Sequence, residues 1–176
     1  MKIIIRQETP PDFSFVFALI KESFKNEPFS DFTEQFLVER LRKSAAFIPE
    51  LSMVAELGGE IIGHIILTKI KIVNGSQSFD SLALAPVSVK PDYQNKGIGG
   101  QLILQAHAKA IELGYKSVVL LGHQSYYPRF GYEKASKFGI KLPFDVPDEN
   151  CMAIELLEGG LEGVSGLVEY PKEFTS

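Results

Sequence analysis

Apolar residues at strand and helix spacings mark out the first elements of the chain. Residues 2–6 are rich in isoleucine, which predicts a short strand. Thr9 then offers an N-cap and Pro10 a first helical position. Apolar side chains follow at helical spacing: Phe13, Val16, Phe17, Ile20 and Phe24. The pattern predicts a strand followed by an amphipathic helix.

A second helix and a hairpin come next. After the break at 26–30, the acids at the start of 31–45 favour a second helix. Two strand-like runs, 51–57 and 61–73, are joined by a Gly-Gly dipeptide at 58–59. Because glycine accepts the positive φ angles of a tight turn, these runs predict an antiparallel hairpin.

The following strand and helix predict a mixed sheet. The run 82–89 is strand-like, but Pro86 cannot donate to a ladder and implies a bulge. An amphipathic helix is expected at 97–114, with His107 on its surface, and 117–121 reads as a buried strand. A helical crossover joins parallel strands, so this pair should be parallel. Three later runs also favour strands: 138–142, 152–157 and 164–170.

Composition indicates one globular domain. The 176 residues are 45% hydrophobic, which suits one sizeable core, so we expect a single domain over residues 1–176. We expect no membrane span, no signal peptide and a cytoplasmic location. The net charge of −4 argues against a nucleic-acid partner. The lone Cys151 excludes an internal disulfide, indicates no metal cluster and is expected to be a packed core thiol.

A glycine-containing loop stands at the start of the helix at 97–114. Gly97 and Gly99 would let a phosphate approach the first helical N–H groups, which have no intrahelical partners. The dinucleotide fingerprint fails because Leu102 stands where its third glycine is needed, and no Gly-Lys-Ser/Thr occurs for a P-loop. An anion site of another type is predicted.

Two motifs resemble those of the GNAT superfamily of N-acetyltransferases. The string Gln94-x-x-Gly97-x-Gly99 is similar to its acyl-CoA signature, and 126–132 (YYPRFGY) is similar to its tyrosine and glycine-aromatic motif. With the run around 82–99, MAIEL and the terminal VEYPKEF, the likeness covers nearly the whole chain and points to a bacterial family of N-acetyltransferases. It implies an α/β fold with a mostly antiparallel, splayed sheet flanked by helices.

The resemblance implies acetyl-CoA as co-substrate and names the residues that bind it. They are Val87, Ser88, Val89, Gln94, Asn95, Lys96, Gly97, Ile98, Gly99 and Gly100. By motif alignment Tyr127, rather than Tyr126, matches the superfamily's general acid, which protonates the leaving thiolate. The alternative is that both tyrosine rings only pack in the core.

The acceptor side is less defined. The resemblance implies transfer to a primary amine, of a small molecule or a peptide, with Pro28 and Phe29 overhanging its site unless they form only a packed turn. His64 and His123 are further acceptor-site candidates, with a structural histidine as the alternative for His64. These histidines and Glu56 are candidate bases, or ordered water serves.

Two other classes of protein would carry the same glycine-containing loop. A non-catalytic acyl-CoA-binding or sensing module need not keep Tyr127, so its presence favours an enzyme. A helix start that binds another phosphate ligand predicts no preference for acetyl-CoA over ATP or NAD. The sequence leaves open whether the protein works alone or as a homodimer.

Overall fold

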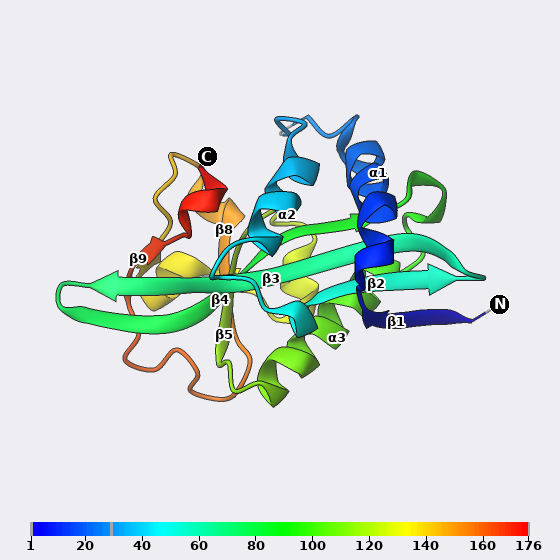
Figure 1. The fold of residues 1–176 in the computed structure, drawn as a ribbon. Coiled ribbons are helices and arrows are strands. Elements are labelled where there is room, and N and C mark those ends of the chain that lie inside the picture. The colour runs from blue at the N-terminus through cyan, green and yellow to red at the C-terminus, as the bar shows by residue number, and fades with distance from the viewer. Residues whose placement is uncertain (1, 29, 176) are drawn as a thin grey trace.

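The computed structural model describes residues 2–28 and 30–175 as a mixed sheet with helices on both faces (Figure 1). The strands are β1 (Ile3–Gln7), β2 (Ser52–Leu57), β3 (Glu60–Asn74), β4 (Gln77–Val89), β5 (Ser117–Leu121), β6 (Glu133–Lys134), β7 (Ile140–Lys141), β8 (Cys151–Glu155) and β9 (Gly166–Glu169). The α-helices are α1 (Phe13–Phe24), α2 (Glu34–Arg42) and α3 (Ile98–Glu112). The short 3-10 helices include η1 (Pro10–Asp12) and η4 (Tyr127–Phe130).

The sheet follows the order β1-β2-β3-β4-β5-β8-β6, and β9 pairs with β3 and with β7. Most of these pairs are antiparallel; β4 with β5 and β7 with β9 are parallel. The predicted hairpin and the predicted parallel pair are therefore confirmed. β4 begins earlier than the predicted strand at 82–89, since residues 77–81 also pair with β3 in the ladder that starts at Asn74 and Gln77.

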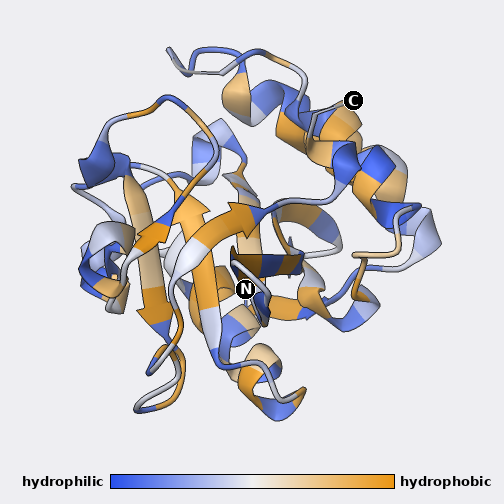
Figure 2. Cartoon of the chain, turned by 90° about the vertical axis from the view of Figure 1, so that its left-hand side faces the viewer, coloured by the Kyte–Doolittle hydropathy of each residue, from blue (hydrophilic) through white to orange (hydrophobic). Residues whose placement is uncertain are grey.

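Helices cover the two faces with separate apolar clusters. Val16 and Ile20 of α1 pack with Leu41 of α2 on one face, and Leu102 and Ala106 of α3 pack on the other. Figure 2 shows the central strands largely in orange, while the helices carry blue positions as well. Across residues 2–28 and 30–175, the helices are too short or too polar to cross a membrane.

The ends of the first two helices follow local hydrogen bonds. Asp12 closes a capping box with Thr9, the residue predicted as the N-cap. The second helix is shorter than predicted: it starts after the N-cap Thr33, which Asp31 supports by accepting its N–H, and Ser44 bonds back to Leu41 O at its end. These side chains therefore fix where the chain enters and leaves the helical layer.

The sheet opens between β4 and β5. The two strands pair only at Leu82↔Val118 and Ala83↔Val119, and then they part. Opposite β3, the register shifts where Ala85 and Pro86 lie across from Ile66 alone. Proline has no N–H for the ladder, so the predicted bulge forms here and lets the second half of β4 leave β5.

A buried charge network ties β1, α2, β2 and β3 together. Glu8 accepts hydrogen bonds from Arg42 (Nε to Oε1, 2.9 Å) and from Ser52, and His64 Nε2 lies 3.3 Å from its Oε2. Burial raises the pKa of Glu8, but the hydrogen bonds from His64, Arg42 and Ser52 outweigh it and bring the pKa to about 2. Burial lowers the pKa of His64, so Arg42 supplies the opposing charge.

The first prediction concerns this network. Arg42→Met should lower the free energy of unfolding by about 3–5 kcal/mol, because it leaves the Glu8 carboxylate buried without a counter-charge. Urea denaturation followed by circular dichroism measures the change. Adding Glu8→Gln should recover part of the loss; a single variant within about 1 kcal/mol of wild type would show that the pair contributes little.

Candidate functional site

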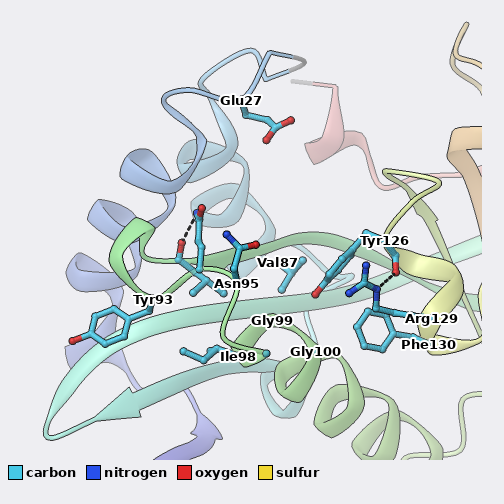
Figure 3. Close-up of a pocket in the computed structure, with 13 residues that line it drawn as sticks. Glu27, Val87, Tyr93, Asn95, Ile98, Gly99, Gly100, Tyr126, Arg129 and Phe130 are labelled. Carbon is cyan, nitrogen blue, oxygen red and sulfur yellow. Dashed lines mark hydrogen bonds between the residues drawn. The ribbon is translucent and has the colours of Figure 1, made fainter.

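The opening of the sheet leads into a cleft of about 690 Å³. Four segments line it: the turn after α1, the second half of β4, the loop and first turn of α3, and the region of η4 (Figure 3). Their lining residues are Glu27, Val87, Val89, Tyr93, Gln94, Asn95, Gly97, Ile98, Gly99, Gly100, Tyr126, Arg129 and Phe130.

The strand wall presents free backbone groups to the cleft. The N–H of Lys90 donates to Ile62 O of β3 at 2.9 Å. Because neighbouring residues of an antiparallel ladder point their backbone groups to opposite sides, those of Val87 and Val89 turn away from β3 and toward the cleft. Val89 O accepts a bond from Gln94 Nε2 at 3.0 Å. An extended ligand can therefore pair with the strand at Val87.

The helix wall presents unpartnered donors. Gly97 is the N-cap of α3 with φ +81°, a conformation that L side chains rarely adopt. Since Gln101 N–H donates to Gly97 O, the N–H groups of Ile98, Gly99 and Gly100 precede the first intrahelical bond. They lie at the positive end of a helix dipole, which suits a phosphate group.

An aromatic wall with one cation closes the other side. Arg129 donates from Nε to Tyr126 O at 2.9 Å, and its guanidinium carbon lies 4.7 Å from the Tyr126 ring centroid. Figure 3 shows Arg129, Tyr126 and Phe130 beside the first turn of α3. A Cβ on Gly99 would come within 3.0 Å of the Tyr126 hydroxyl. This side of the cleft thus combines positive charge with stacking surface.

Tyr127 is placed differently from Tyr126. It is 9% exposed, is not among the lining residues, and meets the rings of Tyr126 and Tyr132 edge-on at centroid distances of 5.1 and 5.8 Å. A Cβ on Gly122, the residue after β5, would overlap the Tyr127 ring. The ring therefore packs where β5 ends. Burial, with a smaller contribution from Tyr126, raises the pKa of Tyr127, so its hydroxyl keeps its proton at neutral pH.

The prediction of a surface role for His107 is wrong. The side chain is buried at 7% exposure, and its Nε2 lies 2.7 Å from the Tyr132 hydroxyl. Burial lowers the pKa of His107 to about 4, so the ring is neutral. The hydroxyl of Tyr132 gives the histidine a buried partner, which its position beside the apolar stripe does not reveal.

The structure brings most of the predicted cofactor residues together. All but Ser88 and Lys96 line the cleft; Ser88 is buried and Lys96 is exposed, with its ammonium 5.7 Å from the Tyr93 ring centroid. Within the described residues, no group of three or more His, Cys, Asp or Glu is placed to hold a metal ion. Cys151 is buried in β8, as predicted.

The predicted acceptor residues are dispersed. His64 is fully buried in the Glu8 network and does not line the cleft. Pro28 is exposed, and the prediction for Phe29 falls outside the described residues. His123 lies across from the turn after α1, with its Nε2 3.3 Å from Glu27 Oε1.

Sequence reasoning missed several lining residues. They are Glu27, Tyr93, Arg129 and Phe130. Arg129 and Phe130 lie inside the tyrosine motif, which is a signal that could have identified them. Glu27 offers no such signal, since only the tertiary fold brings the turn after α1 over the cleft.

Comparison with known proteins gives three kinds of match. A family model described as "Acetyltransferase (GNAT) domain" matches residues 49–134. The chain is 28% identical to the N-acetyltransferase YhbS of Escherichia coli K12 over 172 residues, 98% of each chain. It is 36% identical to the N-acetyltransferase YjhQ of the same strain over 118 residues, 66% of this chain and 65% of YjhQ.

Solved structures resemble the whole chain. A crystal structure of E. coli YhbS in complex with CoA has a TM-score of 0.90 at 28% identity and covers 100% of this chain and 93% of that one. A GNAT family acetyltransferase from Brucella melitensis, in complex with acetyl-CoA, has a TM-score of 0.81 at 29% identity and covers 98% of both chains.

The second prediction concerns the contact beneath Tyr127. Gly122→Ala should lower the free energy of unfolding by about 1–3 kcal/mol, because the new methyl group overlaps the Tyr127 ring. Thermal and urea denaturation measure the loss. In a Tyr127→Ala background the same glycine change should cost much less, since the ring is gone. An equal cost in both backgrounds would show that this overlap is not the cause.

Proposed function

We propose that this chain, as a member of the GNAT superfamily of N-acetyltransferases, transfers the acetyl group of acetyl-CoA to a primary amine. The reaction is a direct attack of the amine on the thioester in a ternary complex, within a single domain of residues 1–176. The observation that carries the proposal is the cleft where free β4 backbone meets the unpartnered amides of α3.

The cofactor site uses both walls of the cleft. The amides of 98–100 bind the pyrophosphate, and the nearby Arg129 guanidinium adds a positive charge. The Val87 backbone pairs with the pantetheine arm as a further strand would. The relatives crystallised with CoA and with acetyl-CoA support this choice of co-substrate over ATP or NAD.

The chemistry needs a neutral amine, a close approach and a stabilised leaving group. The amine nitrogen forms a bond to the thioester carbonyl carbon and loses one proton to ordered water, and the carbon–sulfur bond then breaks. Tyr127 donates its proton to the departing thiolate; its hydroxyl is protonated at neutral pH, and the place of its ring at the end of β5 supports this role. Because both substrates are held in one cleft, the amine and the thioester lie close together, which lowers the activation barrier of the transfer.

The third prediction tests the cofactor site. Gly97→Asp should abolish the thermal stabilisation that acetyl-CoA gives, because a carboxylate would stand at the phosphate site. Gly97→Asn is the matched control, since asparagine has a similar shape, lacks the charge and tolerates a positive φ angle. Differential scanning fluorimetry with acetyl-CoA, ATP and NAD measures the shifts.

In this experiment the asparagine variant should keep most of the acetyl-CoA shift, and the melting temperatures without ligand should stay within a few degrees of each other. Full stabilisation of the aspartate variant by acetyl-CoA would place the pyrophosphate elsewhere. Equal stabilisation of the wild type by all three ligands would indicate a general phosphate site.

The fourth prediction separates the two tyrosines. Tyr127→Phe keeps the packed ring and removes the proton, so kcat should fall by about 10²-fold while stabilisation by acetyl-CoA persists. Tyr126→Phe keeps the stacking surface for Arg129 and should change kcat by less than about threefold. The kcat of each variant is measured from the release of the CoA thiol, with an amine that the wild type acetylates as acceptor. The reverse ranking of the two variants would assign proton donation to Tyr126, the cleft-lining tyrosine.

A further inference from the structure

Among the described residues, Glu27 is the one acidic side chain that lines the cleft. It belongs to the turn after α1, and Figure 3 shows its carboxylate above the cleft, on the opposite side from the first turn of α3. The groups proposed to bind the anionic cofactor are the amides of 98–100 and Arg129. The cleft is therefore polarised, with its negative charge on the side that the cofactor's phosphates do not use.

The neighbouring acids are used to fold the loop itself. Asp31 accepts the N–H of Thr33 at 3.0 Å, and Glu34 accepts the Ser30 hydroxyl at 2.7 Å. Glu27 instead meets His123, which comes from the segment after β5. This contact joins two distant parts of the chain and holds the carboxylate over the cleft. The Glu27 side chain remains 35% exposed, so a ligand can reach it.

A carboxylate at this position is better suited to bind a charged group that does not react than to bind the reacting nitrogen. An ion pair stabilises the ammonium form of an amine, whereas attack on the thioester needs the neutral form. A carboxylate that pairs with a different cationic group of the same molecule avoids this conflict and orients the acceptor as well. It also repels acceptors that carry a carboxylate.

We propose that Glu27, oriented by His123, binds a second, non-reacting ammonium group of the acceptor. The preferred acceptor is then a small molecule with two amines, one of which is acetylated while the other pairs with Glu27. This inference rests on the proposed function, since it assigns the substrate class of the same cleft. His123 acts as a positioning residue.

The test compares three acceptors with four-carbon chains that differ only at the far end. The fourth carbon carries a second ammonium group in putrescine, is a methyl group in butylamine and is a carboxylate in γ-aminobutyrate. At saturating acetyl-CoA, kcat/KM should be about 10-fold higher for putrescine than for butylamine, and lowest for γ-aminobutyrate. Cadaverine and pentylamine repeat the comparison with one more carbon.

Variants assign the preference to one carboxylate. Glu27→Gln should lower kcat/KM for putrescine by about 10-fold, mainly through KM, and change butylamine by less than about twofold. His123→Ala should lower the putrescine value by about threefold, because Glu27 loses its positioning partner. Glu39→Gln makes the same chemical change on the exposed surface of α2, outside the cleft, and should leave both values unchanged.

Three results would overturn the inference. Equal kcat/KM for putrescine and butylamine in the wild type would show that no second ammonium is recognised. An equal fall in kcat for both acceptors in Glu27→Gln would make Glu27 the general base instead. A wild type that is stabilised by acetyl-CoA but acetylates none of these amines would also refute it, while the proposed acetyl transfer keeps its own test in the Gly97 and Tyr127 variants.

Discussion

The end of pairing between β4 and β5 is the constraint on which the rest of the site depends. After Ala83 and Val119, β4 has a neighbour on one side only, and its backbone groups on the other side need partners. The bulge at 85–86 fixes where the strands part, since proline gives the ladder no donor there. Gln94 satisfies Val89 O, and the rest of this edge remains available to a ligand. The cleft is therefore a gap between two strands of one sheet, while the helices pack on the two faces of that sheet in separate clusters.

Charge divides this cleft into two halves with different chemistry. The start of α3 and Arg129 give one side a positive potential without using the buried network around Glu8, which is balanced by Arg42. Glu27 gives the other side its negative charge. Two substrates of opposite charge can therefore occupy one opening of the sheet at the same time, as the proposed direct transfer between them requires.

Local patterns predicted the elements that depend on neighbours in sequence. The Gly-Gly turn between β2 and β3, the bulge at Pro86 and the helix that starts after Gly97 follow from backbone conformation, which a few residues decide. The acidic wall could not be predicted in this way. Glu27 and His123 meet only because α1 lies over the sheet, and His107 is buried only because Tyr132 returns to α3. Such contacts carry no periodicity in the sequence, so only the tertiary structure reveals them.

The tyrosine motif alone does not show which of its two tyrosines lines the cleft. Alignment selects Tyr127, yet the structure lines the cleft with Tyr126 and packs Tyr127 against the end of β5. Tyr126 is the N-cap of η4 and Tyr127 its first residue, and with about three residues per turn of a 3-10 helix their side chains point in different directions. Proton donation needs a hydroxyl near the thioester sulfur, and a pantetheine arm that pairs with Val87, as proposed, runs along the edge of β4 that β5 leaves free. Tyr127 packs against Gly122, the residue that follows β5, whereas Tyr126 stacks with Arg129 beside the proposed phosphate site, so this course of the arm favours Tyr127 as the proton donor.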